Sequence, residues 1–202
     1  MEWKKGLMQI INKVKLNGNN KKFRDIIENP WRFYHSSPGA YNEASANNNG
    51  ETKWQRELYK NETWWYDLEL PIGQKYIAEQ LGSLRVDLIG MKDARPIICE
   101  LKYTSKAGQP FDAILQLLAY YCMIVHNADK LDLKDIHHTN ARNRVFKWRN
   151  LTANPILMLR ANHNYWNNWV KETPKNKAAK EIIKQCKEKG LEIQLFIDDK
   201  RL

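Results

Sequence analysis

The sequence has no apolar run of about 20 residues, the length that a membrane-spanning helix needs. Its first twenty residues, MEWKKGLMQIINKVKLNGNN, lack the continuous apolar block and the small-residue cleavage site of a secretory signal. The three cysteines, Cys99, Cys122 and Cys186, lie far apart, with no CxxC pair and no histidine cluster nearby. This pattern favours neither a disulfide framework nor a zinc site. These absences predict a cytoplasmic protein without membrane contact.

Acidic residues are outnumbered in this chain of 202 residues. The 33 Lys and Arg against 23 Asp and Glu give a formal charge of +10 at pH 7. Such an excess favours a polyanionic partner, most simply nucleic acid, although a basic surface can also serve solubility alone. Charge by itself therefore indicates a class of partner and no activity.

The chain divides near residue 50. Residues 1–50 predict an N-terminal helical/loop extension that ends in an Asn-rich linker, and residues 51–202 predict the main domain. The pattern of the main domain predicts helix 51–61, strands 64–72, 84–90 and 96–103, helix 111–127, strand 154–161, helix 175–190 and strand 191–199. This order predicts an α/β or α+β domain with helices packed on a central mixed sheet.

Charged residues interrupt two of the apolar strands. Asp87 lies within strand 84–90, and Glu100 and Lys102 lie within strand 96–103. A core strand excludes charges unless they are paired or bind an ion. These three residues are therefore candidates for a functional site.

An antiparallel hairpin of the two strands would bring the acids together. Successive side chains in a strand point to opposite faces, so one face would carry Leu84, Val86, Leu88, Ile97, Cys99 and Leu101. The other face would carry Arg85, Asp87, Ile89, Ile98, Glu100 and Lys102. A register that pairs Ile89 with Ile98 also pairs Asp87 with Glu100, and a slip of one residue would separate the acids.

Two bare carboxylates in this arrangement need compensation. At roughly 5 Å and an effective dielectric constant near 20 they repel by about 3 kcal/mol, whereas a favourable cross-strand pair contributes only about 0.2–1 kcal/mol. A divalent cation, the neighbouring Lys102 and Arg85, or a proton held through a raised pKa could each compensate. Oxygen ligands suit magnesium or manganese better than zinc. Lys102 on the same face could hold an attacking water or stabilise a phosphorane-like transition state.

Asp87 followed by Glu100-Leu101-Lys102 resembles the motif of the PD-(D/E)XK nuclease superfamily, whose restriction-endonuclease-like core has the αβββαβ order. The resemblance implies that Asp87 and Glu100 bind Mg²⁺, or Mn²⁺ in its place, with help from the main-chain carbonyl of Leu101. It also implies that Lys102 assists catalysis. Gln116 and Tyr120, four residues apart on the next helix, resemble the Gln-x-x-x-Tyr motif of the RecB-type exonuclease branch, which holds the substrate phosphate or orders the site.

The resemblance covers residues 51–125 and has one departure. Many members carry a metal-binding glutamate in the first helix, and Gln55 occupies the matching position here. Glu51 and Glu57 are the alternatives, and Glu51 lies nearer the Trp54/Leu58 face. The sequence leaves the choice among these residues open.

Basic residues beyond the site suggest a substrate surface. The stretch NARNRVFKWRN, residues 140–150, interleaves basic and aromatic side chains, which suits phosphate contacts and stacking on bases. The candidate nucleic-acid contacts there are Arg144, Lys147, Trp148 and Arg149. A solvated loop fits the same stretch equally well, and the lysines of helix 175–190 predict a solvated face.

We therefore expect a Mg²⁺-dependent deoxyribonuclease that hydrolyses phosphodiester bonds. RNA remains an alternative substrate, because no residue pattern reads a 2′-hydroxyl. A catalytically silent nucleic-acid-binding module is a second alternative, and an interaction partner for an acidic protein, with residues 1–50 as docking arm, is a third. A homodimer and a larger complex both stay open.

Overall fold

A computed structural model of the chain describes residues 3–16, 18–30, 33–34, 50–75, 84–104, 108–132, 147–167 and 169–202. The helices are α1 (Trp3–Ile11), α2 (Gly18–Glu28), α3 (Glu51–Asn61), α4 (Pro110–Asp132), the 3-10 helix η4 (Trp148–Thr152), α5 (His163–Trp166) and α6 (Pro174–Glu188). The strands are β1 (Phe33–Tyr34), β2 (Trp65–Lys75), β3 (Leu84–Lys92), β4 (Arg95–Lys102), β5 (Ile156–Ala161), β6 (Glu192–Ile197) and β7 (Lys200–Arg201).

A mixed sheet forms the centre of the molecule. Strands β2 to β7 lie in sequence order, and the two-residue strand β1 extends the sheet beside β2. β2, β3 and β4 pair antiparallel, whereas β4, β5 and β6 pair parallel. The parallel pairs need crossover connections, which α4 and α6 provide. The expected α/β class with a mixed sheet and flanking helices is thereby confirmed.

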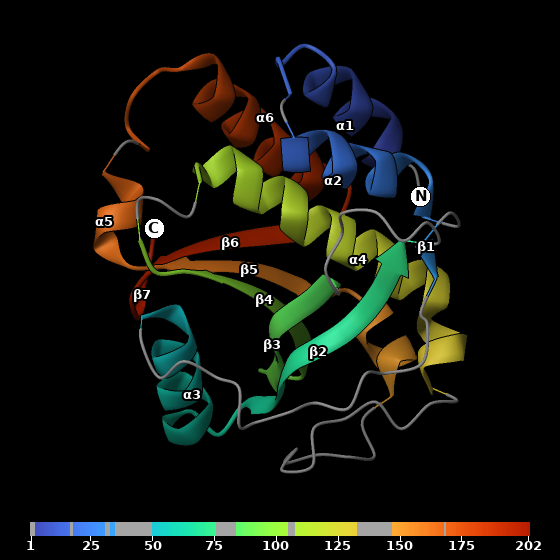
Figure 1. The fold of residues 1–202 in the computed structure, drawn as a ribbon, viewed down its shortest axis with the longest axis vertical. Coiled ribbons are helices and arrows are strands. Elements are labelled where there is room, and N and C mark those ends of the chain that lie inside the picture. The colour runs from blue at the N-terminus through green and yellow to red at the C-terminus, as the bar shows by residue number, and fades with distance from the viewer. Residues whose placement is uncertain are drawn as a thin grey trace.

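Helices cover both faces of the sheet (Figure 1). α4 and α6 lie on one face, with α1 and α2 packed against them, and α3 lies on the other face. The larger hydrophobic cluster joins α1, α2, α4 and α6 to the sheet, and a smaller cluster joins α3 to the opposite face. Within the described residues, α1 and α2 therefore share one core with the helices of the main domain.

Local sequence signals explain where several elements begin and end. The turn between β3 and β4 is Asp93–Ala94, and both residues have positive φ angles of 51° and 58°, as a tight hairpin requires. Pro174 opens α6, and the Thr173 side chain caps it by accepting from the N–H of Asn176. Gly190 follows the helix with a φ of 78°, in agreement with the predicted end.

Two details of the predicted strands were wrong. β2 continues to Lys75, beyond the predicted end at residue 72, and a shift in register between Pro71 and Gly73 accommodates the missing N–H of Pro71. Val86 packs in the larger cluster, and Leu88 packs in the smaller one, so they do not share a face. The ladder between β3 and β4 ends at Leu88. Val86, two residues earlier in β3, pairs with Leu70 of β2.

No helix in the described ranges is long and apolar enough to cross a membrane.

Candidate active site

The two acidic strands separate at Asp87. Ile89 pairs with Ile98, as the sequence predicted, and Leu88 with Cys99 is the last pair of the ladder on this side. One residue further, Asp87 Oδ2 accepts a hydrogen bond of 2.7 Å from the backbone N–H of Leu101. The carboxylate of Asp87 thus bonds to β4 where the ladder has ended, next to Glu100.

Glu100 lies at the centre of the site and is 1% exposed. Its Oε1 accepts a hydrogen bond from the ammonium group of Lys102, two residues along the same strand. Its Oε2 is buried and has no hydrogen-bond partner among the residues that the structure describes. A buried carboxylate oxygen without a partner carries a desolvation cost, so this atom has free capacity for a ligand.

Burial raises the pKa of Asp87 well above its ordinary value, and the neighbouring Glu100 raises it further. Burial also raises the pKa of Glu100, while the charge of Lys102 and its hydrogen bond to Glu100 oppose that rise. Burial lowers the pKa of Lys102, but the surrounding carboxylates, Glu100 first, outweigh it and raise that pKa above its usual range. Compensation therefore comes from Lys102 and from raised carboxyl pKa values. Arg85, the other expected compensator, instead pairs with Glu69 at 3.4 Å.

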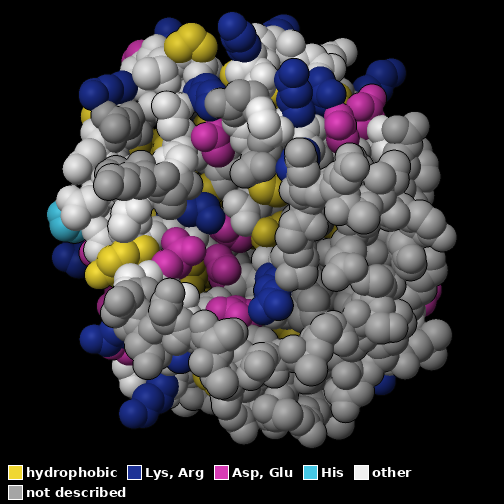
Figure 2. Space-filling model, in the orientation of Figure 1, with side chains coloured by type: hydrophobic (Ala, Val, Ile, Leu, Met, Phe, Trp, Pro, Cys, Tyr) yellow, Lys and Arg dark blue, Asp and Glu magenta, His cyan; other side chains and the backbone are white. Residues whose placement is uncertain are grey.

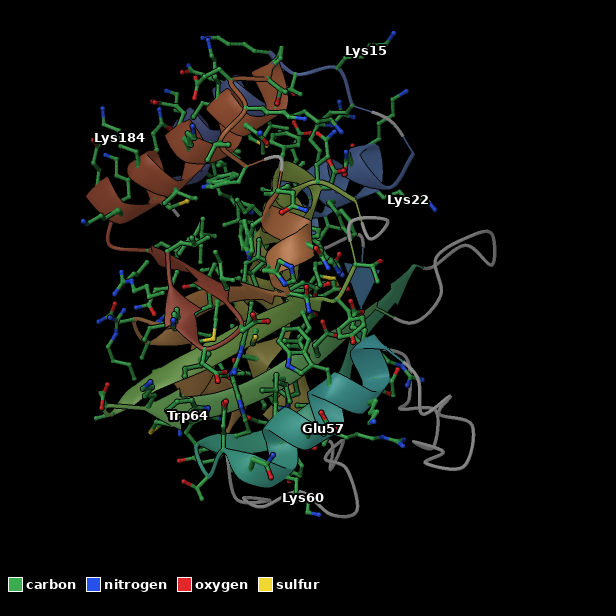
Figure 3. The ribbon with its side chains drawn as sticks, turned by 90° about the vertical axis from the view of Figure 1, so that its left-hand side faces the viewer. Lys15, Lys22, Glu57, Lys60, Trp64 and Lys184 are labelled. Carbon is green, nitrogen blue, oxygen red and sulfur yellow. The ribbon has the colours of Figure 1, made fainter. Side chains whose placement is uncertain are left out.

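The first turns of α3 approach the site with two side chains. Gln55 is 3% exposed, and its Nε2 donates to the backbone carbonyl of Asp87 over 2.7 Å. Glu51 Oε2 accepts from the N–H of Tyr103 over 2.9 Å, and its charge raises the pKa values of Asp87 and Glu100. Glu57 lies on the exposed side of α3, with Lys53 at 3.9 Å (Figure 3). Of the two candidate glutamates, the structure brings Glu51 to the site and leaves Glu57 outside it.

Gln116 and Tyr120 form a pair on α4, as their spacing predicted. Gln116 Nε2 donates to the Tyr120 hydroxyl over 2.7 Å. Burial raises the pKa of Tyr120, and the charges of Glu100 and Asp87 raise it further. Because the Tyr120 oxygen accepts from Gln116, its own proton can be donated to another group.

Tyr165 on α5 is a site neighbour that the sequence did not single out. It is 3% exposed, and its hydroxyl is buried without a hydrogen-bond partner in the described part of the chain. α5 is attached to the end of β4, because the N–H of Asn162 donates to the carbonyl of Lys102 over 3.0 Å. Burial raises the pKa of Tyr165, and the charges of Asp112 and Glu100 raise it further. No motif marks this tyrosine, since only the β5–α5 connection brings it here.

The donor atoms suit a hard divalent cation. Asp87 and Glu100 offer carboxylate oxygens, of which Glu100 Oε2 is unpartnered, and oxygen ligands are those that Mg²⁺ and Mn²⁺ prefer. Within the described part of the chain, no group of three or more His, Cys, Asp or Glu side chains is placed to share one ion. A main-chain oxygen would have to complete the set. On the face of the molecule drawn in Figure 2, acidic side chains gather beside Lys or Arg side chains near the middle.

The predicted nucleic-acid contacts have different outcomes. Lys147 is exposed. Trp148 is 1% exposed and belongs to the core, so its ring is not available to stack on a base and that prediction was wrong. Arg149 is exposed, and its Nε donates to Asp132 over 2.6 Å. Arg144 lies outside the described residues.

Comparisons of the chain with models of protein families, with curated proteins and with solved structures gave no match. The resemblance to the PD-(D/E)XK superfamily therefore stays a prediction, carried by the residues named above.

Proposed function

We propose that the protein is a Mg²⁺-dependent nuclease that hydrolyses phosphodiester bonds in DNA and has a restriction-endonuclease-like core. The observation that carries the proposal is the buried, unpartnered Oε2 of Glu100, between Asp87 and Lys102 at the opening of two strands. The element order α3, β2, β3, β4, α4, β5 supports the same proposal.

The cation site consists of Asp87 and Glu100, with the main-chain carbonyl of Leu101 as third donor. When bound, the ion supplies charge neutralisation and a water of lowered pKa. The raised pKa values of both acids mean that the pair holds a proton readily, which ion binding must displace. Metal affinity therefore rises with pH.

Lys102 stabilises negative charge and does not accept a proton. Its raised pKa keeps the ammonium group charged at neutral pH. A charged group cannot serve as general base, so its role is to orient the water or to donate to a phosphate oxygen. Its bond to Glu100 fixes it at 9% exposure at the end of β4.

Tyr120 and Gln116 position the phosphate. The side-chain amide of Gln116 donates a hydrogen bond to the Tyr120 oxygen, so the phenolic proton points away from the amide. The charges of Glu100 and Asp87 raise the pKa of this hydroxyl, so the Tyr120 proton lies close enough to the proposed cation site to interact with it electrostatically. A phosphate oxygen placed there would receive the hydrogen bond.

Incubation of purified protein with supercoiled plasmid, linear duplex and single-stranded DNA, in Mg²⁺, Mn²⁺ or EDTA, tests the activity. We expect cutting in either metal and none in EDTA, and loss of the supercoiled form would identify an endonuclease. A parallel set with RNA tests the alternative substrate. Binding of DNA without cutting in any metal would contradict the proposal and favour the catalytically silent module.

A further inference from the structure

The positive charge of the chain is concentrated in two segments of the sequence. Residues 3–28 and 174–189, which contain α1, α2 and α6, carry 13 Lys and Arg against 4 Asp and Glu. The rest of the chain is almost balanced, with 20 Lys and Arg against 19 Asp and Glu. The overall charge of +10 is thus nearly all a property of this one layer.

The fold places these helices side by side, although they come from opposite ends of the sequence (Figure 1). α1 crosses α6 at Gly6, where an added Cβ would lie 2.6 Å from Oε1 of Gln185. The residues next to this contact, Lys5 and Lys184, are both exposed. Figure 3 shows Lys15, Lys22 and Lys184 on this layer.

This positively charged layer of helices begins beside the candidate active site. Lys175 in the first turn of α6 binds Asp112 in the first turn of α4, with 3.0 Å between Nζ and Oδ1. Asn20 of α2 donates to the same carboxylate oxygen over 2.7 Å. Gln116 lies one turn further along α4. The layer is therefore continuous with the helix that carries the Gln116–Tyr120 pair.

We infer that the surface formed by residues 3–16, 18–28 and 174–189, here called the basic layer, binds the phosphate backbone of double-stranded nucleic acid that extends beyond the candidate active site. A regular array of phosphates matches such a set of exposed ammonium groups, and counterion release favours the contact. The inference rests on the proposed function in one respect only, namely that the bound duplex is the substrate of the nuclease.

If the inference holds, the affinity for duplex DNA should depend on the length of the duplex. A domain of about 200 residues is roughly 40 Å across, which corresponds to about 12 base pairs at 3.4 Å each. A duplex of 8 base pairs can occupy the active site without reaching across the basic layer. A duplex of 30 base pairs can contact both.

The test compares K15E/K184E with K53E/K200E, which makes the same change in net charge at exposed lysines outside the basic layer. Fluorescence anisotropy in EDTA measures the affinity for duplexes of 8 and 30 base pairs over a series of salt concentrations. We expect K15E/K184E to bind the long duplex at least about tenfold more weakly than wild type, with a salt slope reduced by about 2. The short duplex should lose little affinity, and K53E/K200E should behave as wild type.

Equal affinity of K15E/K184E and wild type for the long duplex would overturn the inference. Polyglutamate could also be added as a competitor for the bound duplex. If it displaced the duplex as effectively, per charge, as unlabelled duplex does, the inference would be overturned and an acidic protein would be the better candidate partner. Thermal melting at low salt serves as the folding control, because reversing two charges relieves repulsion within the layer and should not lower the melting temperature. Since all binding is measured without metal, a protein that binds as expected but never cuts refutes only the proposed catalysis.

Discussion

Asp87 of β3 accepts a hydrogen bond from the backbone N–H of Leu101 in β4, with 2.7 Å between Oδ2 and N. A side chain here satisfies a backbone donor beyond the last ladder pair, Leu88 with Cys99. The end of the ladder lies next to Glu100, whose Oε2 has no hydrogen-bond partner among the described residues. The same bond fixes the orientation of the Asp87 carboxylate before any ligand arrives.

Asp87→Asn should stabilise the protein in EDTA at pH 8. Burial raises the pKa of Asp87, so the favourable protonated form is fully present only below the unfolded value of about 4 and is lost as pH rises through the folded value. Asparagine carries no charge and can still accept from Leu101. Urea unfolding at pH 8, 6.5 and 5 should show a gain of about 1–2 kcal/mol that shrinks toward pH 5. A variant less stable than wild type at pH 8 would contradict this account.

Glu51→Gln should lower the cleavage rate about tenfold without lowering the melting temperature, because it removes a negative charge that would attract the divalent cation to Asp87 and Glu100. The amide oxygen can still accept from the N–H of Tyr103, so the variant removes the charge that acts on Asp87 and Glu100 and keeps the contact. Glu57→Gln on the exposed side of the same helix is the matched control and should cut as wild type does. Equal rates for both variants would remove Glu51 from the site.

Gln116 and Tyr120 should act as one unit. Tyr120→Phe removes the proton donor, and Gln116→Ala removes the group that directs it. Each single variant should cut about 10–100-fold more slowly, and the double variant should be little worse than either one, because coupled residues are not additive. Single-turnover rates provide the measurement. Additive losses in the double variant would mean that the pair does not work together.

Tyr165→Phe should leave the free energy of unfolding unchanged or raise it slightly, because the hydroxyl has no hydrogen bond to lose within the described structure. If the substrate or its water supplies the missing partner, the cleavage rate should fall about tenfold in the same variant. Chemical denaturation and cleavage rates on one preparation separate the two effects. A clear loss of stability would show that the hydroxyl has a partner in the folded protein.

Much of the fold could be predicted from periodicity. α3 matches its predicted range 51–61, and the register that pairs Ile89 with Ile98 follows from matching the apolar residues of two neighbouring strands. The strand faces could not be predicted fully, because helices cover both sides of the sheet and apolar residues then fit either face. This is why Val86 was assigned to the wrong side.

The candidate site could be predicted only in its local parts. Glu100 and Lys102 share a strand, and Gln116 and Tyr120 share a helix, so spacing alone relates them. Tyr165 and the choice of Glu51 depend on how distant segments pack, which no spacing reveals. Trp148 was wrong for a related reason, because an aromatic residue in a basic stretch fits a core position as well as a stacking surface.

The most direct test of the proposed nuclease is the cleavage rate of Glu100→Gln in Mg²⁺ on the best substrate. Glu69→Gln, which makes the same chemical change at the partner of Arg85, is the control. Both variants are first shown by thermal melting to be folded. We predict that Glu100→Gln cuts at least about 100-fold more slowly than wild type, whereas Glu69→Gln cuts at the wild-type rate. Metal-dependent cutting by Glu100→Gln at the wild-type rate would contradict the proposed site.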